Sequence, residues 1–254
     1  MLATVHNWVA EASQIARQSY NHVAMRRKAD HSPVTVADEQ IETLLRTRIR
    51  AAYPDHMILG EEQGVSGGSS PYVWALDPID GTTNFGYGLP IWGISVGLLY
   101  NNVPVLGCFY MPLLDEWYEA DLSGPALFNG EPITVAADTQ LDDTEAWMCV
   151  PSNIHRRYRC DYRGKVRVLG SAAAYVSYVA HGKAAGALLG RVKIWDVAAT
   201  FAILERAGGA ARYLGSDLPV ELGPLLDGRS APAPIIVGSP AALDLLQATI
   251  TVRS

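Results

Sequence analysis

The stretch "DPIDGTTNF", residues 77–85, follows the apolar run "YVWAL" at residues 72–76 and decides how the rest of the chain is interpreted. The apolar run predicts a buried strand, and the residues after it include two acids, a proline, a glycine and two threonines. Asp-Pro and Asp-Gly are common turn formers, so an ordinary surface turn is one interpretation. A turn needs only one or two of these residues, whereas a site that binds cations and a phosphate uses nearly all of them.

The overall composition indicates a globular protein and excludes several classes of partner. The chain has 254 residues, 49% of them apolar, which is enough for one large domain or two closely associated ones. The formal net charge of −6 gives no electrostatic basis for binding nucleic acid or an anionic membrane surface. The first residues do not resemble a signal peptide, and no apolar run is long enough to span a bilayer. We therefore expect a cytoplasmic protein.

The first half of the chain predicts two helices on an antiparallel meander. Apolar residues recur at helical spacing within residues 5–16 and 41–49. Strands are predicted at "YVWAL", "IWGISVGLLY", "VPVLGCFY" and "EWYEA". Asn101-Asn102 and Asn129-Gly130 stand at hairpin turns. Residues 64–71, "GVSGGSSP", are predicted to be a flexible loop.

The second half of the chain predicts alternating strands and helices, which is typical of an α/β unit. The predicted strands are "EAWMCV", "VRVLG", "AGALL", "ARYLG" and "PIIVGS", and the predicted helices include "SAAAYVSYVAH" and "DVAATFAILERAGG". Ser239 and Pro240 suit the cap and first position of a last helix. We divide the chain into an α+β half at residues 1–140 and an α/β half at residues 141–254.

Acids occur beside apolar stretches in several segments, and each segment alone has an ordinary explanation. Asp38 fits a capping box with Thr35, the pair Glu61-Glu62 fits a solvated surface, and Asp196 fits a helix cap. Burying such acids is costly, however, unless they are paired or bind a metal. Mg²⁺ prefers oxygen ligands of this kind, and two such ions would activate a water for hydrolytic phosphoryl transfer.

The glycine of the central motif adds a place for the phosphate. Gly81 permits a sharp turn, and a short helix beginning after it would present free N–H groups to a phosphate. The Thr82 hydroxyl could orient the attacking water.

Taken together, these segments resemble the inositol monophosphatase family of Mg²⁺-dependent, lithium-sensitive phosphatases. The resemblance covers nearly the whole chain and is carried by "SPVTVAD", "GEE", "WALDPIDGTTNF", "GSAA", "IWDVAA" and "AGG", in that order. It implies a layered αβαβα sandwich of the inositol monophosphatase/fructose-1,6-bisphosphatase type, with the active site between the two halves. It also implies two or three Mg²⁺ ions per subunit and a homodimer.

The resemblance also implies roles for particular residues. Glu61, Asp77 and the carbonyl of Ile79 resemble the ligands of a first metal, and Asp77, Asp80 and Asp196 resemble those of a second. Asp38 and Thr82 resemble the pair that holds the nucleophilic water, and Glu61 joins this catalytic set through a third, weaker metal. The residues implied in binding phosphate and substrate are Asp80, Gly81, Thr82, Thr83, Gly170, Ser171 and Ala172.

One departure from the family pattern bears on the substrate. Inositol-specific members have a Glu seven residues before the Asp of "IWD", whereas this chain has Leu189 there. An apolar side chain cannot accept hydrogen bonds from the ring hydroxyls. Nearby Arg191 and Lys193 either contact a second anionic group on the substrate or form a solvated basic turn. A further cluster is assigned to the surface or a subunit interface: Arg156, Arg157, Arg159, Arg163, Lys165 and Arg167.

We therefore expect a Mg²⁺-dependent hydrolase of a small phosphorylated alcohol similar to inositol monophosphate. Related chains act on histidinol phosphate, fructose 1,6-bisphosphate, phosphoadenosine phosphate or NADP, and the acids do not distinguish among them. Two hypotheses from other classes stay open: a regulatory binding partner of the transcription machinery, and an inactive structural homologue.

Overall fold

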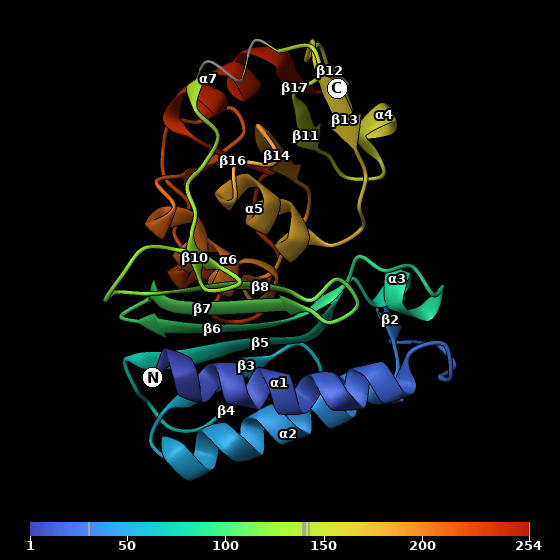
Figure 1. The fold of residues 1–254 in the computed structure, drawn as a ribbon, viewed down its shortest axis with the longest axis vertical. Coiled ribbons are helices and arrows are strands. Elements are labelled where there is room, and N and C mark those ends of the chain that lie inside the picture. The colour runs from blue at the N-terminus through green and yellow to red at the C-terminus, as the bar shows by residue number, and fades with distance from the viewer. Residues whose placement is uncertain (30, 139–140, 142, 254) are drawn as a thin grey trace.

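A computed structural model describes residues 1–29, 31–138, 141 and 143–253, and its elements stack in five layers (Figure 1). Helices α1 (Leu2–Ser19) and α2 (Val36–Ala52) form the first layer, followed by an eight-stranded sheet. Helices α5 (Ala172–Ala180) and α6 (Ile194–Arg206) separate that sheet from a five-stranded one, and α7 (Pro240–Thr249) covers the far side. The layered αβαβα sandwich expected from the sequence is confirmed.

The larger sheet is a meander with one parallel pairing. Its order is β10-β9-β8-β7-β6-β5-β3-β4. Its strands are β3 (Met57–Gly60), β4 (Gly64–Ser66), β5 (Tyr72–Asp80), β6 (Gly93–Tyr100), β7 (Val103–Met111), β8 (Glu116–Asp121), β9 (Leu127–Phe128) and β10 (Glu131–Pro132). The predicted antiparallel meander is confirmed for β5 to β10. Strand β3 was not predicted, and it pairs with β5 in parallel. The predicted loop at residues 64–71 is wrong in part, since β4 begins there and pairs with β3.

Both predicted hairpin turns are present. Asn101 and Asn102 have φ of 48° and 69°, and Asn129 and Gly130 have φ of 48° and 84°. These left-handed values match the twist of the flanking strands, and asparagine and glycine tolerate them best. The sequence signal and the backbone geometry agree because a two-residue turn is a purely local feature.

The smaller sheet contains all five strands predicted for the second half. Its order is β13-β11-β14-β16-β15. Its strands are β11 (Trp147–Cys149), β13 (Lys165–Arg167), β14 (Gly186–Leu189), β15 (Ala210–Tyr213) and β16 (Ile235–Gly238). β11 pairs in parallel with β13 and β14, whereas β16 is antiparallel to β14 and β15.

Several short elements complete the described chain. They are the pairs β1 (Arg26–Arg27) with β2 (Pro33–Val34) and β12 (Tyr158–Cys160) with β17 (Ile250–Val252), helices α3 (Thr82–Gly86) and α4 (Ile154–Arg157), and a 3₁₀ helix at Gly223–Leu225. Ser239 caps α7 by accepting the Ala242 N–H, as predicted. The predicted boundary at residue 140 lies outside the described residues and stays a prediction. Among the described residues, no helix is both long and apolar enough to cross a membrane.

Side chains alternate between the two faces of β5, and one of these faces is directed toward α6. Trp74 and Leu76 belong to the apolar cluster beneath α1 and α2, whereas Val73 and Ala75 belong to the cluster shared with α5 and α6. Because side chains alternate between the faces of a strand, Asp77 lies on the same face as Val73 and Ala75. Burial on both faces also explains why β5 has a continuous apolar sequence.

Helix α6 lies directly on the larger sheet because two glycines leave room for its backbone. A Cβ on Gly107 would lie 1.9 Å from the Ala199 carbonyl oxygen, and one on Gly97 would lie 2.6 Å from the Ala199 nitrogen. These distances leave no space for a methyl group. The close contact fixes the start of α6 relative to the ends of β3 and β5.

We predict that Gly107→Ala destabilises the protein by about 3 kcal/mol, because overpacking here displaces backbone and not a flexible side chain. Urea unfolding measures the effect. Gly124→Ala is the matched control, since a Cβ at Gly124 meets no atom within 4 Å, and it should change the free energy of unfolding by less than about 0.5 kcal/mol. Equal changes in the free energy of unfolding for Gly107→Ala and Gly124→Ala would contradict the close contact between Gly107 and α6.

Candidate active site

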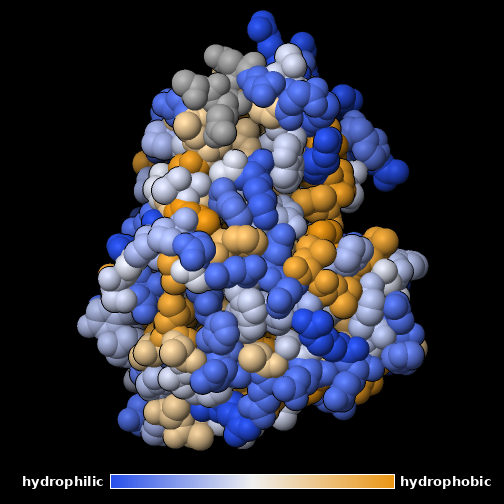
Figure 2. Space-filling model, viewed as in Figure 1, coloured by the Kyte–Doolittle hydropathy of each residue, from blue (hydrophilic) through white to orange (hydrophobic). Residues whose placement is uncertain are grey.

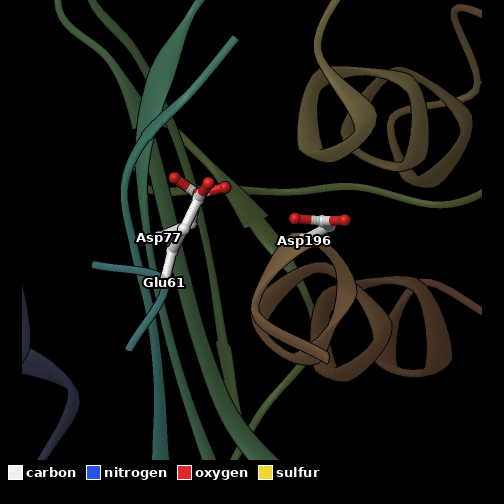
Figure 3. Close-up of side chains that lie close together, drawn as sticks. All are labelled: Glu61, Asp77 and Asp196. Atoms are coloured by element: carbon white, nitrogen blue, oxygen red, sulfur yellow. The ribbon is translucent and has the colours of Figure 1, made fainter. Parts of the chain in front are cut away.

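Three carboxylates from different elements meet between the larger sheet and α6. Glu61 follows β3, Asp77 lies in β5, and Asp196 lies in the first turn of α6. Each offers an oxygen atom within 4.8 Å of the others (Figure 3). Glu61 and Asp77 are neighbours because β3 and β5 pair in parallel with Gly60 opposite Leu76, and the Glu61 N–H donates to the Leu76 carbonyl at 3.1 Å.

The strand that carries Asp77 is longer than predicted. β5 continues to Asp80, whereas the sequence suggested that it ends at Leu76. The pairing of β5 with β6 shifts register between Asp77 and Asp80, around Pro78, which cannot donate a backbone hydrogen bond. The Ile79 N–H donates to Asp77 Oδ1 at 3.1 Å and so holds the carboxylate.

Asp196 is held by the start of its own helix. The predicted helix starts at Asp196, which is wrong by two residues, since α6 begins at Ile194. Asp196 Oδ2 accepts the Lys193 N–H at 2.7 Å. A carboxylate in the first turn of a helix is stabilised by the free N–H groups and by the helix dipole.

Asp80 connects the two halves of the molecule. Its carboxylate accepts hydrogen bonds from the backbone N–H groups of Ala172, at 3.1 Å, and Ala173, at the start of α5. Ser171 caps the same helix by accepting the Ala174 N–H at 3.0 Å. Asp80 lies outside the group of three mutually close carboxylates, so its roles as a metal ligand and in phosphate binding stay predictions.

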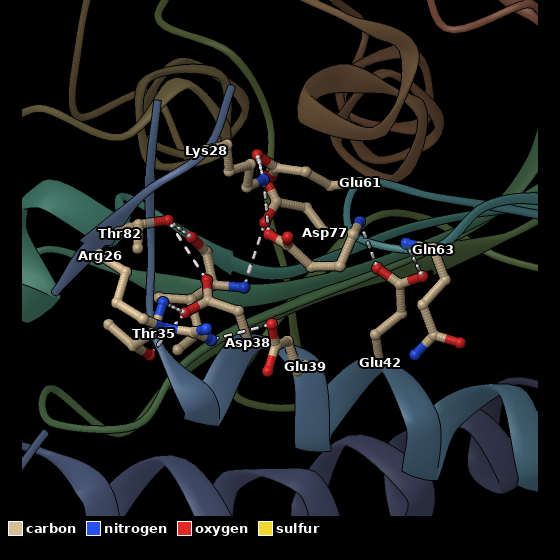
Figure 4. Close-up of polar contacts among 12 residues, drawn as sticks. Arg26, Lys28, Thr35, Asp38, Glu39, Glu42, Glu61, Gln63, Asp77 and Thr82 are labelled. Carbon is tan, nitrogen blue, oxygen red and sulfur yellow. Dashed lines mark hydrogen bonds and ion pairs between the residues drawn. The ribbon is translucent and has the colours of Figure 1, made fainter. Parts of the chain in front are cut away.

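The predicted capping box brings Asp38 beside Thr82 (Figure 4). Asp38 Oδ2 accepts the Thr35 N–H at 2.8 Å and the Thr35 hydroxyl at 2.6 Å. The other oxygen, Oδ1, lies 3.3 Å from Thr82 Oγ1, which also lies 3.0 Å from the Ile79 carbonyl. Capping therefore orients Asp38 toward the threonine with which the sequence analysis paired it.

Gly81 makes the turn from β5 into α3, as predicted. Its φ is 94°, and a Cβ would lie 3.1 Å from the Ile91 carbonyl oxygen, so a larger residue would be strained and crowded. Thr82 and Thr83 occupy the first turn of α3, where backbone N–H groups lack acceptors within the helix. The role of Gly81, Thr82 and Thr83 in binding phosphate stays a prediction.

Two residues of the site were not predicted. Lys28 Nζ lies 2.8 Å from Glu61 Oε1 and 2.7 Å from Glu62 Oε1. Asn84 Nδ2 donates to the carbonyls of Ile91 and Leu169, both at 2.6 Å, and joins α3 to the loop before α5. Asn84 was part of the central motif, but Lys28 stood in a loop segment that gave no signal for it.

Burial and mutual repulsion raise the pKa of several acids in the site. Burial, with the nearby charge of Glu61, holds the pKa of Asp77 and Asp196 well above the ordinary range. Burial also raises the pKa of Asp80 to about 7 and that of Asp38 to about 6. Closely spaced buried carboxylates are costly unless a cation neutralises them, and an all-oxygen donor set suits a hard divalent ion. The residues present therefore fit a metal ion.

A cavity of about 250 Å³ opens beside Asp196. The predicted substrate loop, Gly170, Ser171 and Ala172, lines it together with Leu189 and Arg191. Lys193 does not line this cavity, and its Nζ lies 5.0 Å from the centre of the Trp195 ring. Of the two cations considered near the substrate, Arg191 is the one that the fold brings to the cavity.

The layered fold and the carboxylate cluster define an α/β protein with acids that fit a metal ion between a sheet and a helix. The model of the inositol monophosphatase family matches residues 1–221, and the chain belongs to this family.

The chain is similar to proteins and solved structures that are named as inositol monophosphatases, as fructose-1,6-bisphosphatases or as SuhB. The chain is 31% identical to the fructose-1,6-bisphosphatase/inositol-1-monophosphatase of Aquifex aeolicus, over 82% of this chain and 83% of that protein. It is 32% identical to the Nus factor SuhB of Xylella fastidiosa, over 78% and 74% of the two chains. The structure of an inositol monophosphatase from Thermotoga maritima superposes with a TM-score of 0.82 at 26% identity, covering 95% of this chain and 93% of that one.

The raised pKa values predict how stability depends on pH. Each acid has a folded pKa above its unfolded value, so between about pH 4 and about pH 7 the folded state binds more protons than the unfolded state. In the presence of a chelator, the melting temperature should therefore fall by about 5 °C or more between about pH 5 and about pH 8. Differential scanning calorimetry measures this fall.

Saturating Mg²⁺ should reduce the fall, because a bound cation offsets the repulsion between the carboxylates. Asp77→Asn should reduce it as well, since it removes one of the titrating groups. A melting temperature that rises with pH in the chelator would contradict the electrostatic description of the site.

Proposed function

We propose that the protein is a Mg²⁺-dependent phosphomonoester hydrolase that acts on a small phosphorylated alcohol. The observation that carries this proposal is the group formed by Glu61, Asp77 and Asp196, in which Asp77 lies on the strand that leads into the turn at Gly81. Membership of the inositol monophosphatase family supports the phosphatase class.

The three clustered carboxylates would hold the metal, with Asp80 and the Ile79 carbonyl as further ligands. Bound Mg²⁺ polarises phosphoryl oxygens and lowers the pKa of a water, which is the chemistry that hydrolysis of a phosphate ester needs. The N–H groups of Gly81, Thr82 and Thr83 would bind the phosphate oxygens at the start of α3.

Asp38 and Thr82 would position the attacking water and accept its proton. Asp38 Oδ2 already accepts two hydrogen bonds from Thr35, so Oδ1 is the oxygen directed toward Thr82. A carboxylate with a pKa of about 6 is ionised above that pH and is still basic enough to take a proton. This arrangement supports hydrolysis without a covalent intermediate on the protein.

Leu189 and Arg191 would shape the choice of substrate. Leu189 is buried and apolar at a position that lines the cavity, so it offers no hydrogen bond to a ring hydroxyl. Arg191 offers a cation to the same cavity. An apolar residue and a cation in the same cavity disfavour a substrate that is recognised mainly through its hydroxyl groups.

We also propose that the protein is a homodimer. Hydrophobic surface is visible on the side of the molecule where α3 lies (Figure 2). Exposed apolar residues in the segments that contain or follow α3 and β13 include Leu89, Val166 and Val168. Such surface on a globular chain favours contact with another subunit. Light scattering of the purified protein should give twice the monomer mass, and a monomer would contradict the proposal.

A regulatory role is the second candidate, and the similarity to a protein named Nus factor SuhB favours it. The clustered acids argue against a purely noncatalytic protein, because their burial is costly without a cation. The two roles predict different results in a single phosphatase assay.

Phosphate release should depend on Mg²⁺ for one or more esters in a defined panel. The panel is inositol 1-phosphate, fructose 1,6-bisphosphate, histidinol phosphate, phosphoadenosine phosphate and NADP, each assayed with Mg²⁺ and with a chelator. Asp77→Asn should lower kcat/KM at least about 100-fold, because it removes a ligand charge without a change in volume.

Asp227→Asn is the matched control, because Asp227 forms an exposed ion pair with Arg229 far from these carboxylates in sequence. It should retain the wild-type rate. Wild-type activity in Asp77→Asn would overturn the metal assignment, and no release from any ester by a folded protein that binds Mg²⁺ would favour the regulatory role.

A further inference from the structure

A second cavity, of about 610 Å³, adjoins the cavity beside Asp196. Gly190 and Arg191 line both, so the two cavities meet at the loop between β14 and α6. A volume of this size accommodates a small molecule or a large part of one. The second cavity is therefore placed to receive whatever extends beyond the catalytic cavity along this loop.

The charge of the second cavity is strongly positive. Four arginines line it, with no aspartate or glutamate among the lining residues: Arg156, Arg157, Arg191 and Arg253. The cluster was assigned to the surface or a subunit interface from the sequence, and for Arg156 and Arg157 the structure gives a more specific location. Four cations in one concave site are conspicuous in a chain whose net charge is −6.

The arginines of this cavity lack acidic partners. Six other arginines of the described chain form ion pairs with acids: Arg26, Arg46, Arg48, Arg159, Arg212 and Arg229. Within the described residues, none of the four arginines of the cavity forms such a pair. Arginines that line one cavity without carboxylate partners suit a phosphate group, which can accept two parallel hydrogen bonds from a guanidinium.

Hydrogen bonds to backbone carbonyls hold the segments that line the cavity. The Arg253 N–H donates to the Arg157 carbonyl at 2.8 Å, and Arg253 Nε donates to the Tyr158 carbonyl at 2.9 Å. In another lining segment, which forms a second wall, the Ala231 N–H donates to the Val192 carbonyl at 2.7 Å and joins this wall to the loop of Arg191. Pro232 and Pro234 further restrict this wall. The site is thus largely organised before any ligand binds, which lowers the entropic cost of binding.

We propose that this cavity binds a second anionic group, of the phosphate type, on the substrate whose ester is hydrolysed at the carboxylate cluster. The preferred substrates are then phosphomonoesters that carry another phosphate, and Arg191 lies where the two parts of the molecule meet. This inference rests on the proposed phosphatase function, but the arginine cavity is an independent observation. The same chemistry would also suit a separate phosphate-bearing ligand, so the experiment distinguishes the two sources.

The kinetic experiment compares fructose 1,6-bisphosphate with fructose 1-phosphate, which differ by a single phosphate. In the double variant Arg156→Gln/Arg157→Gln, the ratio of kcat/KM for the bisphosphate to that for the monophosphate should fall about tenfold, because charge-assisted hydrogen bonds to the second phosphate are lost. Arg191→Gln should lower the same ratio. Arg159→Gln is the matched control, since Arg159 pairs with Asp161 and does not line the cavity, and it should keep the wild-type ratio.

A binding experiment separates failure of this inference from failure of the phosphatase function. Calorimetry with Asp77→Asn protein in a chelator measures binding of fructose 1,6-bisphosphate and of inorganic phosphate without turnover. Bisphosphate binding that weakens about tenfold when Arg156→Gln/Arg157→Gln is added supports the cavity, even if the wild-type protein hydrolyses no ester. In that case the phosphatase function fails and the phosphate site remains.

Two results would overturn the inference. In the first, the arginine variants of the cavity have the same ratio of kcat/KM as Arg159→Gln and also bind the bisphosphate with the same affinity. The other is binding of inorganic phosphate that depends on Arg156 and Arg157 while the ratio of kcat/KM does not. The second result would assign the cavity to a separate ligand and not to the substrate.

Discussion

The burial of several carboxylates at one junction is the constraint on which the rest of this structure depends. Asp38, Asp77 and Asp80 are at most 5% exposed, and like charges so placed repel one another strongly. Much of the surrounding structure supplies hydrogen-bond donors or positive charge to this junction. The start of α5 donates to Asp80, the start of α6 donates to Asp196, and Lys28 pairs with Glu61. A bound cation would complete this compensation.

The five layers explain how residues far apart in the sequence come to share this junction. Two strands pair in parallel and present Glu61 and Asp77 side by side, and α6 crosses the same face of the sheet with Asp196 in its first turn. Helix α6 lies directly on the glycines of the sheet. The distance of Asp196 from Glu61 and Asp77 therefore depends on backbone contacts and not on adjustable side chains. The sandwich is therefore part of the site and not only its support.

The parts of the structure that follow from local sequence could be predicted, and the parts that depend on distant contacts could not. The five strands of the second half and both hairpin turns are encoded by apolar runs and by asparagine and glycine. The end of the apolar run at Leu76 suggested the end of β5, yet the strand continues through a register shift that only its pairing with β6 reveals. The parallel pairing of β3 with β5, the contact of Lys28 with Glu61 and the bond from Ala172 to Asp80 are tertiary features with no local signal.

In the proposed hydrolase, Asn84 would give the two ends of a bound ester a common support. Its amide group holds the Ile91 carbonyl, near the turn that precedes α3, and the Leu169 carbonyl, at the loop that lines the cavity beside Asp196. Gly170 packs against this amide so closely that its Cβ would lie 2.8 Å from it, so the loop cannot shift without disturbing Asn84. A leaving group that fits the loop poorly would thus also misplace the phosphorus. Discrimination among alcohols would then appear in the rate of the chemical step as much as in binding.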